Sequence, residues 1–215
     1  MKLRITYNAP VILTFTIAAV AVFLLNSAVE SSKAWFMAYP TFSVGAKAYV
    51  GLFSHILGHA SWQHLMGNFM LILLIGPVLE ERHGSMSLLI MIAITALVTG
   101  LATAFFSHNA LLGASGQVFM MILLASTANI RAGEIPLTFI AIAIVYLGGE
   151  VVSEVKGGDN VSHFGHLVGG SVGAIFGFLG AARAKKPKAV GPVTPLAALA
   201  TPKPAKPGAQ TKKSG

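Results

Sequence analysis

The chain has 215 residues, of which 54% are hydrophobic and only 10% are charged, and its mean hydropathy is +0.74. Soluble domains usually carry about 25% charged residues, so this composition excludes an ordinary soluble enzyme and indicates a polytopic membrane protein. The absence of cysteine excludes disulfides, thiolate metal sites and a cysteine nucleophile. The net charge of +8 is concentrated in the C-terminal tail, which favours contact with anionic membrane lipid over nucleic acid.

Apolar runs divide the first part of the chain into membrane-spanning segments. A helix needs about 20 apolar residues to cross a hydrocarbon core. The segment 29–62 is too polar to span, and its aromatic residues beside lysines are typical of the membrane interface. The sequence therefore predicts an all-α polytopic membrane protein with a membrane-embedded first loop and six transmembrane helices, at about residues 10–28, 63–79, 85–106, 114–130, 137–152 and 162–182.

The lysines and arginines predict the orientation of these helices. Six spans place both termini on one side of the membrane. That side holds most of the basic residues, and short cytoplasmic loops are enriched in them, so both termini are expected in the cytoplasm. Residues 183–215 are rich in Lys, Pro and Ala without apolar periodicity, which predicts a disordered cytoplasmic tail after a membrane domain of residues 1–182.

Polar residues gather at the start of the second, fourth and sixth predicted spans. These spans all enter from the non-cytoplasmic side. Ionisable residues inside a membrane are costly and are candidates for function. We therefore expect one polar cluster in the outer leaflet, formed by His64, Asn68, Ser115, His163 and His166.

The motif Gly113-Ala-Ser115-Gly places a serine at the start of an apolar helix. A hydroxyl beside the unpaired N–H groups of a first helical turn suits nucleophilic acyl transfer, although small-residue helix packing is an alternative interpretation. A histidine could take the serine proton. Because no acid lies at this level, the residues favour a two-residue dyad over a triad.

His64 and Asn68 are four residues apart, so they share one face of the second span. Both side chains can donate a hydrogen bond to an oxygen that becomes negative. Together with the N–H of Ser115 they could form an oxyanion site.

Over roughly residues 45–182 the chain resembles the rhomboid family of intramembrane serine proteases. The resemblance rests on separated motifs: Phe53-Ser-His-Ile-Leu-Gly-His59, Trp62-Gln-His-Leu-Met-Gly-Asn68, Glu80-Glu-Arg82, Gly113-Ala-Ser-Gly116 and Gly165-His-Leu-Val-Gly-Gly170. It implies that Ser115 is the nucleophile and His166 its base, that His64 and Asn68 line the oxyanion site next to Gly113, and that the enzyme cleaves transmembrane segments of other proteins without metal or cofactor.

The choice between His163 and His166 follows from the glycines around them. In the family the base is followed three residues later by a glycine, a relation that His166 has with Gly169. Glycines at 165, 169, 173 and 177 form a stripe at four-residue spacing, which predicts a close helix–helix contact.

Two positions depart from the family pattern. Val50-Gly51 stands where many relatives have Trp-Arg, and Phe119 stands where many have a tyrosine that packs against the catalytic histidine. We expect the Phe119 ring to stack in the same way, without the hydroxyl.

The other histidines and charges have simpler interpretations. His55 and His59 are expected to hydrogen-bond to backbone in the embedded loop, because backbone at membrane depth must be satisfied internally. A zinc site formed with His64 is an alternative, but no carboxylate accompanies these three residues. Glu80 and Arg82 are expected to hold the cytoplasmic end of the second span.

The sequence thus predicts a serine endopeptidase of the inner membrane whose site opens to the periplasm. A non-catalytic relative that binds transmembrane clients is one alternative. A histidine-rich transporter is a second, and it would require ionisable residues along a complete path through the membrane.

Overall fold

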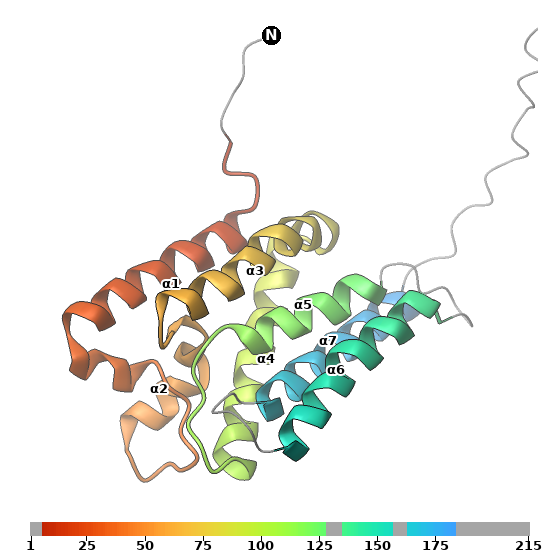
Figure 1. The fold of residues 1–215 in the computed structure, drawn as a ribbon. Helices are drawn as coiled ribbons and strands as arrows, with labels where there is room; N and C mark the ends of the chain where they lie inside the picture. The colour runs from red at the N-terminus through yellow and green to blue at the C-terminus, as the bar shows by residue number, and fades with distance from the viewer. Residues whose placement is uncertain (1–5, 128–134, 157–162, 184–215) are drawn as a thin grey trace, which may run out of the picture. The chain divides into compact units, whose positions relative to one another are not determined.

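The computed structural model describes residues 6–127, 135–156 and 163–183. Of the predicted cytoplasmic tail, residues 184–215 lie outside these residues, as do the side chains of Glu150 and His163, whereas Arg183 is the last residue of α7. The described helices (Figure 1) are α1 (Pro10–Ala28), η1 (Glu30–Trp35), α2 (Ala46–Ser54), η2 (His55–Leu57), α3 (Trp62–His83), α4 (Ser85–Phe106), α5 (Ser115–Ser126), α6 (Leu137–Lys156) and α7 (His163–Arg183).

Helices lie at all six positions where spans are predicted, and the bounds of α1 and α4 match the prediction. Among the described residues, α1, α3 and α4 are long and apolar enough to cross a membrane. The protein is therefore a helical integral membrane protein. Six crossings and two cytoplasmic termini remain predictions.

Helix α1 begins at Pro10, whose ring suits a first helical position because no N–H is needed there. No acidic residue lies in its first turn. Glu80 of α3 supplies the missing charge: its carboxylate accepts the N–H groups of Val11 at 3.0 Å and Ile12 at 3.1 Å. Ser85 of α4 donates its hydroxyl to the same carboxylate at 2.7 Å. Glu80, which is 4% exposed, thus joins three helices at one end of the bundle.

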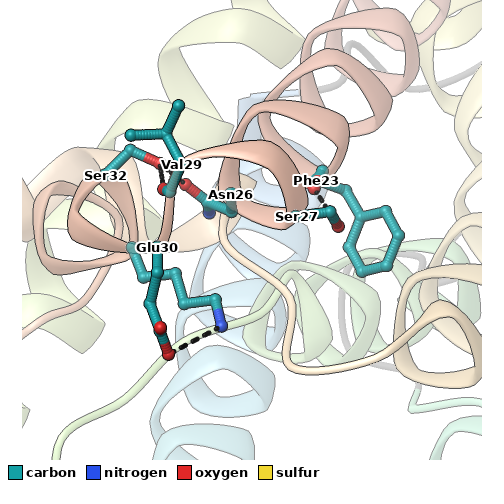
Figure 2. Close-up of polar contacts among 7 residues, drawn as sticks. Phe23, Asn26, Ser27, Val29, Glu30 and Ser32 are labelled. Carbon is teal, nitrogen blue, oxygen red and sulfur yellow. Dashed lines mark hydrogen bonds and ion pairs between the residues drawn. The ribbon is translucent and has the colours of Figure 1, made fainter.

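The other end of α1 turns into the first loop (residues 29–61) through a small polar cluster (Figure 2). The Ser32 hydroxyl lies 2.6 Å from the Asn26 side-chain oxygen and 2.6 Å from the Val29 carbonyl oxygen, within reach of both as a donor. An exposed ion pair between Lys33 and Glu30 adds little, because both charges are solvated. The turn is held mainly by the buried Asn26.

The first loop contains η1, α2 and η2 and packs against α4. The contact is close at Gly100 of α4, where a Cβ atom would lie 2.7 Å from the Leu52 carbonyl oxygen. Further on, Ala38 forms an isolated antiparallel bridge with Leu111, with N–H···O distances of 2.8 and 2.9 Å. The first loop is therefore connected to the segment that precedes α5.

Helix α5 is the centre of the described bundle, in contact with α3, α4, α6 and α7 (Figure 1). Its residues 117–124 are all buried. A helix that is apolar all round suits such a position, because every face meets another helix. The first residue of this central helix is Ser115.

Candidate functional site

The segment before Ser115 is irregular, and its backbone N–H groups donate hydrogen bonds to residues of the first loop. Gly113 has φ +119°, a conformation that residues with a side chain rarely adopt. Its N–H donates to the carbonyl of His55 at 2.9 Å. The N–H of Ala114 donates to Nε2 of His59 at 3.3 Å. Ser115 therefore enters α5 from a backbone that two first-loop residues position.

His166 of α7 lies against the start of α5. Its ring stacks on Phe119, with centroids 4.6 Å apart and an angle of 7° between the planes. Phe119 is four residues after Ser115 and so lies on the same face of α5. The prediction that the Phe119 ring stacks as the family tyrosine does is confirmed.

The close contact between α5 and α7 determines where His166 lies along α5. A Cβ atom at Gly169 would overlap the carbonyl oxygen of Gly116 and lie 2.8 Å from its carbonyl carbon. A Cβ atom at Gly116 would lie 3.4 Å from the carbonyl oxygen of Gly165. His166, between these two α7 glycines, is thereby held beside the residue that follows Ser115. The predicted close contact along the α7 glycines is confirmed.

His64 and Asn68 approach the same turn from α3. A Cβ atom at Gly113 would lie 2.7 Å from both Cε1 and Nε2 of His64, and 3.6 Å from Nδ2 of Asn68. The His64 ring therefore occupies the space that Gly113 leaves open, and Asn68 lies beside it.

The helix start explains the position of His64. Ser61 is the N-cap of α3, and its side chain accepts the N–H of His64 at 3.2 Å. This bond satisfies one of the free N–H groups at the helix start. Asn68 follows one turn later and is buried.

His59 belongs to this group of residues although the sequence did not place it there. Its Nδ1 lies 3.1 Å from the Leu57 carbonyl oxygen, which confirms the predicted backbone contact. Its Nε2 lies 3.1 Å from Nδ2 of Asn68. No helical spacing relates the two residues, because an irregular segment separates His59 from α3. The small residues around His59, Gly58 and Ala60, offered no signal for this contact.

The remaining predicted residues lie elsewhere or have other partners. The ring of His55 bonds to the Gly51 carbonyl at 2.9 Å and to the Thr99 hydroxyl at 3.2 Å. Glu80 binds the first turn of α1, so its predicted anchoring role is supported by direct contacts. The backbone of His163 begins α7, but its side chain is not among those described.

Comparison with known proteins identifies the family of the chain. Residues 46–183 match the Rhomboid domain. The chain is 24% identical to the Rhomboid protease GlpG of Haemophilus influenzae over 183 residues, covering 83% of this chain and 95% of that protein. It is 30% identical to Rhomboid-related protein 1 of Caenorhabditis elegans over 138 residues, covering 59% of this chain and 38% of the worm protein. Because the domain match includes most of the chain and every helix from α2 to α7, the protein belongs to the rhomboid family.

Proposed function

We propose that the protein is an intramembrane serine endopeptidase that uses a Ser115–His166 dyad to cleave transmembrane segments of other membrane proteins. The observation that carries the proposal is the convergence of three helices on one turn. Ser115 begins α5, His166 of α7 stacks on the next turn of α5, and the His64 ring occupies the space at Gly113 with Asn68 beside it.

In the first step, His166 accepts the proton of the Ser115 hydroxyl while its oxygen attacks the carbonyl carbon of the scissile peptide bond. The ring stacked on Phe119 limits the rotation of His166, so the base keeps one orientation. The substrate must be extended at this bond, because the amides of an intact helix are shielded by their own hydrogen bonds.

The attack leaves a negative charge on the former carbonyl oxygen. His64, Asn68 and the N–H groups at the start of α5 are donors beside the nucleophile turn. Donors that are already oriented stabilise this oxygen more than the neutral carbonyl, which lowers the barrier. His166 then gives its proton to the leaving amine, and an acyl-enzyme remains on Ser115.

Water completes the reaction by attacking the acyl-enzyme with His166 again as base. We place the site near the outer leaflet, opening to the periplasm of a bacterial inner membrane, because the helix starts that carry these residues share one side in the predicted topology. A shallow site allows water to reach Ser115 without crossing the hydrocarbon core.

A fluorophosphonate probe tests the activated serine directly. In detergent, we expect the wild type to be labelled, and Ser115→Ala and His166→Ala to lose labelling and cleavage of a transmembrane substrate by about 10³-fold or more. His163→Ala is the control for a neighbouring histidine and is expected to keep labelling.

Two results would contradict the proposal. A folded wild type that neither reacts with the probe nor cleaves a transmembrane substrate would favour a client-binding relative. Labelling that survives Ser115→Ala would place the reactive group elsewhere.

A further inference from the structure

The ring of His59 connects two parts of the candidate site that belong to different elements. It lies between η2 and α3, is 5% exposed, and packs edge-on against the His64 ring with centroids 5.0 Å apart. Its Nε2 is within hydrogen-bond distance of both the Asn68 amide and the Ala114 backbone N–H. One nitrogen atom thus contacts the side chain of a proposed oxyanion donor and the residue immediately before the proposed nucleophile.

The backbone partner determines which hydrogen atoms the ring carries. A peptide N–H can only donate, so Nε2 must accept from Ala114 through its lone pair. The ring hydrogen is then on Nδ1, where it donates to the Leu57 carbonyl. Burial is consistent with this neutral ring, because it lowers the pKa of His59 to about 4.

The orientation of Asn68 follows from the same nitrogen. Since Nε2 has no hydrogen to donate, Asn68 must present its NH₂ group to it and not its oxygen, and the N–H groups of Asn68 and Ala114 then share the one lone pair of Nε2. A flipped amide would set two lone pairs against each other. The same NH₂ group borders the nucleophile turn, because a Cβ atom at Gly113 would lie 3.6 Å from Nδ2.

We infer that His59 is a positioning residue, which fixes the Asn68 amide and the Ala114 N–H so that both the oxyanion donor and the backbone of Ser115 hold their direction before substrate binds. The inference rests on the proposed function, because it assigns Asn68 to the oxyanion. His59 itself touches no reacting atom in this scheme.

Two substitutions of His59 test the hydrogen-bond acceptor independently of the ring shape. His59→Phe keeps a planar ring against His64 and removes both nitrogens, whereas His59→Gln offers an amide oxygen near the position of Nε2. We expect His59→Phe to lower kcat for a transmembrane substrate about 10- to 100-fold with KM changed less than threefold. His59→Gln is expected to restore most of kcat.

The coupling to Asn68 is the sharper test. In an Asn68→Ala background, His59→Phe is expected to cost less than about threefold in kcat, because its main partner is already absent. His55→Phe is the matched control: its ring is buried in the same loop but bonds to Gly51 and Thr99. Its effect should be the same with and without Asn68.

A measurement that needs no activity completes the experiment. With ¹⁵N-labelled histidine in the full-length protein, Nε2 of His59 is expected to show the shift of an unprotonated, hydrogen-bonded nitrogen, assigned through His59→Gln and altered by Asn68→Ala. A protonated Nε2, or equal kcat for His59→Phe and His59→Gln, would overturn the inference. So would an undiminished His59→Phe effect in the Asn68→Ala background. A wild type that never labels with fluorophosphonate but shows the expected ¹⁵N signal would instead refute the proposed function alone.

Discussion

Glycines lie on both sides of Ser115, but they make two different kinds of contact. On the α7 side, Gly169 and Gly173 lie against the backbone of α5 at Gly116 and Met120. On the α3 side, Gly113 lies against the end of the His64 side chain. The first contact sets the separation of two helices, because neither backbone can move without carrying its helix. The contact at Gly113 leaves room for the His64 ring, which can rotate away without moving a helix.

This difference predicts that equal substitutions should have unequal consequences for stability and activity. A methyl group in the backbone contact separates α5 from α7, which shifts His166 and weakens the whole interface. A methyl group at Gly113 displaces a ring locally while the helices remain packed. The following substitutions test this from the largest expected effect to the smallest.

Gly169→Ala should have the largest effect, because the new Cβ overlaps the Gly116 carbonyl and no side chain can yield. We expect a loss of about 3 kcal/mol in the free energy of unfolding, as for severe overpacking, and loss of fluorophosphonate labelling. Thermal unfolding in detergent measures the loss of stability.

Gly180→Ala is the matched control on the same helix, since a Cβ there meets nothing within 4 Å. It should be neutral or stabilise α7 by up to about 1 kcal/mol through helix propensity. Equal unfolding temperatures for the two variants would mean that the contact of Gly169 with the Gly116 backbone does not limit stability.

Gly113→Ala should lower activity without separating α5 from α7. The new Cβ would lie 2.7 Å from the His64 ring and Gly113 has φ +119°, so we expect a 10- to 100-fold lower kcat and about 1–3 kcal/mol less stability from the strained backbone. Substrate cleavage and thermal unfolding measure the two effects.

Gly45→Ala separates backbone strain from the contact with His64. Gly45 also has a positive φ, +73°, but a Cβ there meets nothing within 4 Å. This variant should lose stability and keep kcat. If it lost as much kcat as Gly113→Ala, displacement of His64 would not be the cause.

Of the glycine substitutions at contacts around Ser115, Gly116→Ala should have the smallest effect, although Gly116 adjoins the nucleophile. Its Cβ would lie 3.3 Å from the Thr99 methyl group and 3.4 Å from the Gly165 carbonyl. A shift of a few tenths of an ångström relieves both close contacts. The higher helix propensity of alanine then stabilises α5 by about 1 kcal/mol. Labelling should stay within about threefold of wild type.

Thr99→Ser provides the check on this small effect, because it removes the methyl group that a Cβ at 116 would meet. Any loss in Gly116→Ala should be partly restored in the double variant. A large loss that Thr99→Ser does not reduce would mean that α5 and α7 are held more tightly here than the contact distances indicate.

Much of this arrangement could be predicted from local patterns. The apolar runs located α1 and α4 with their bounds, and the four-residue glycine spacing in 165–177 identified the face of α7 that meets another helix. Phe119 could be predicted to stack because it lies one turn after Ser115. Such predictions succeed because apolar segments form helices in a membrane and helical spacing determines which side chains share a face.

The first loop shows where this reasoning ends. Its polar composition predicted an embedded segment but not η1, α2 and η2, nor the bridge between Ala38 and Leu111. Interfacial composition describes where a segment lies and not how its backbone is paired. The prediction that His55 and His59 bond to backbone was correct, yet it omitted their side-chain partners Thr99 and Asn68.

The sequence by itself determined the membrane class, the helices at the six predicted spans, the family motifs and the faces that carry the candidate site residues, because these depend on composition and short-range periodicity. Only the tertiary structure decided that Glu80 holds the first turn of α1, that Gly113 makes room for His64, and that His59 joins Asn68 to the nucleophile turn. Those contacts link residues from separate elements, and their partners depend on how the helices pack rather than on any repeat within one of them.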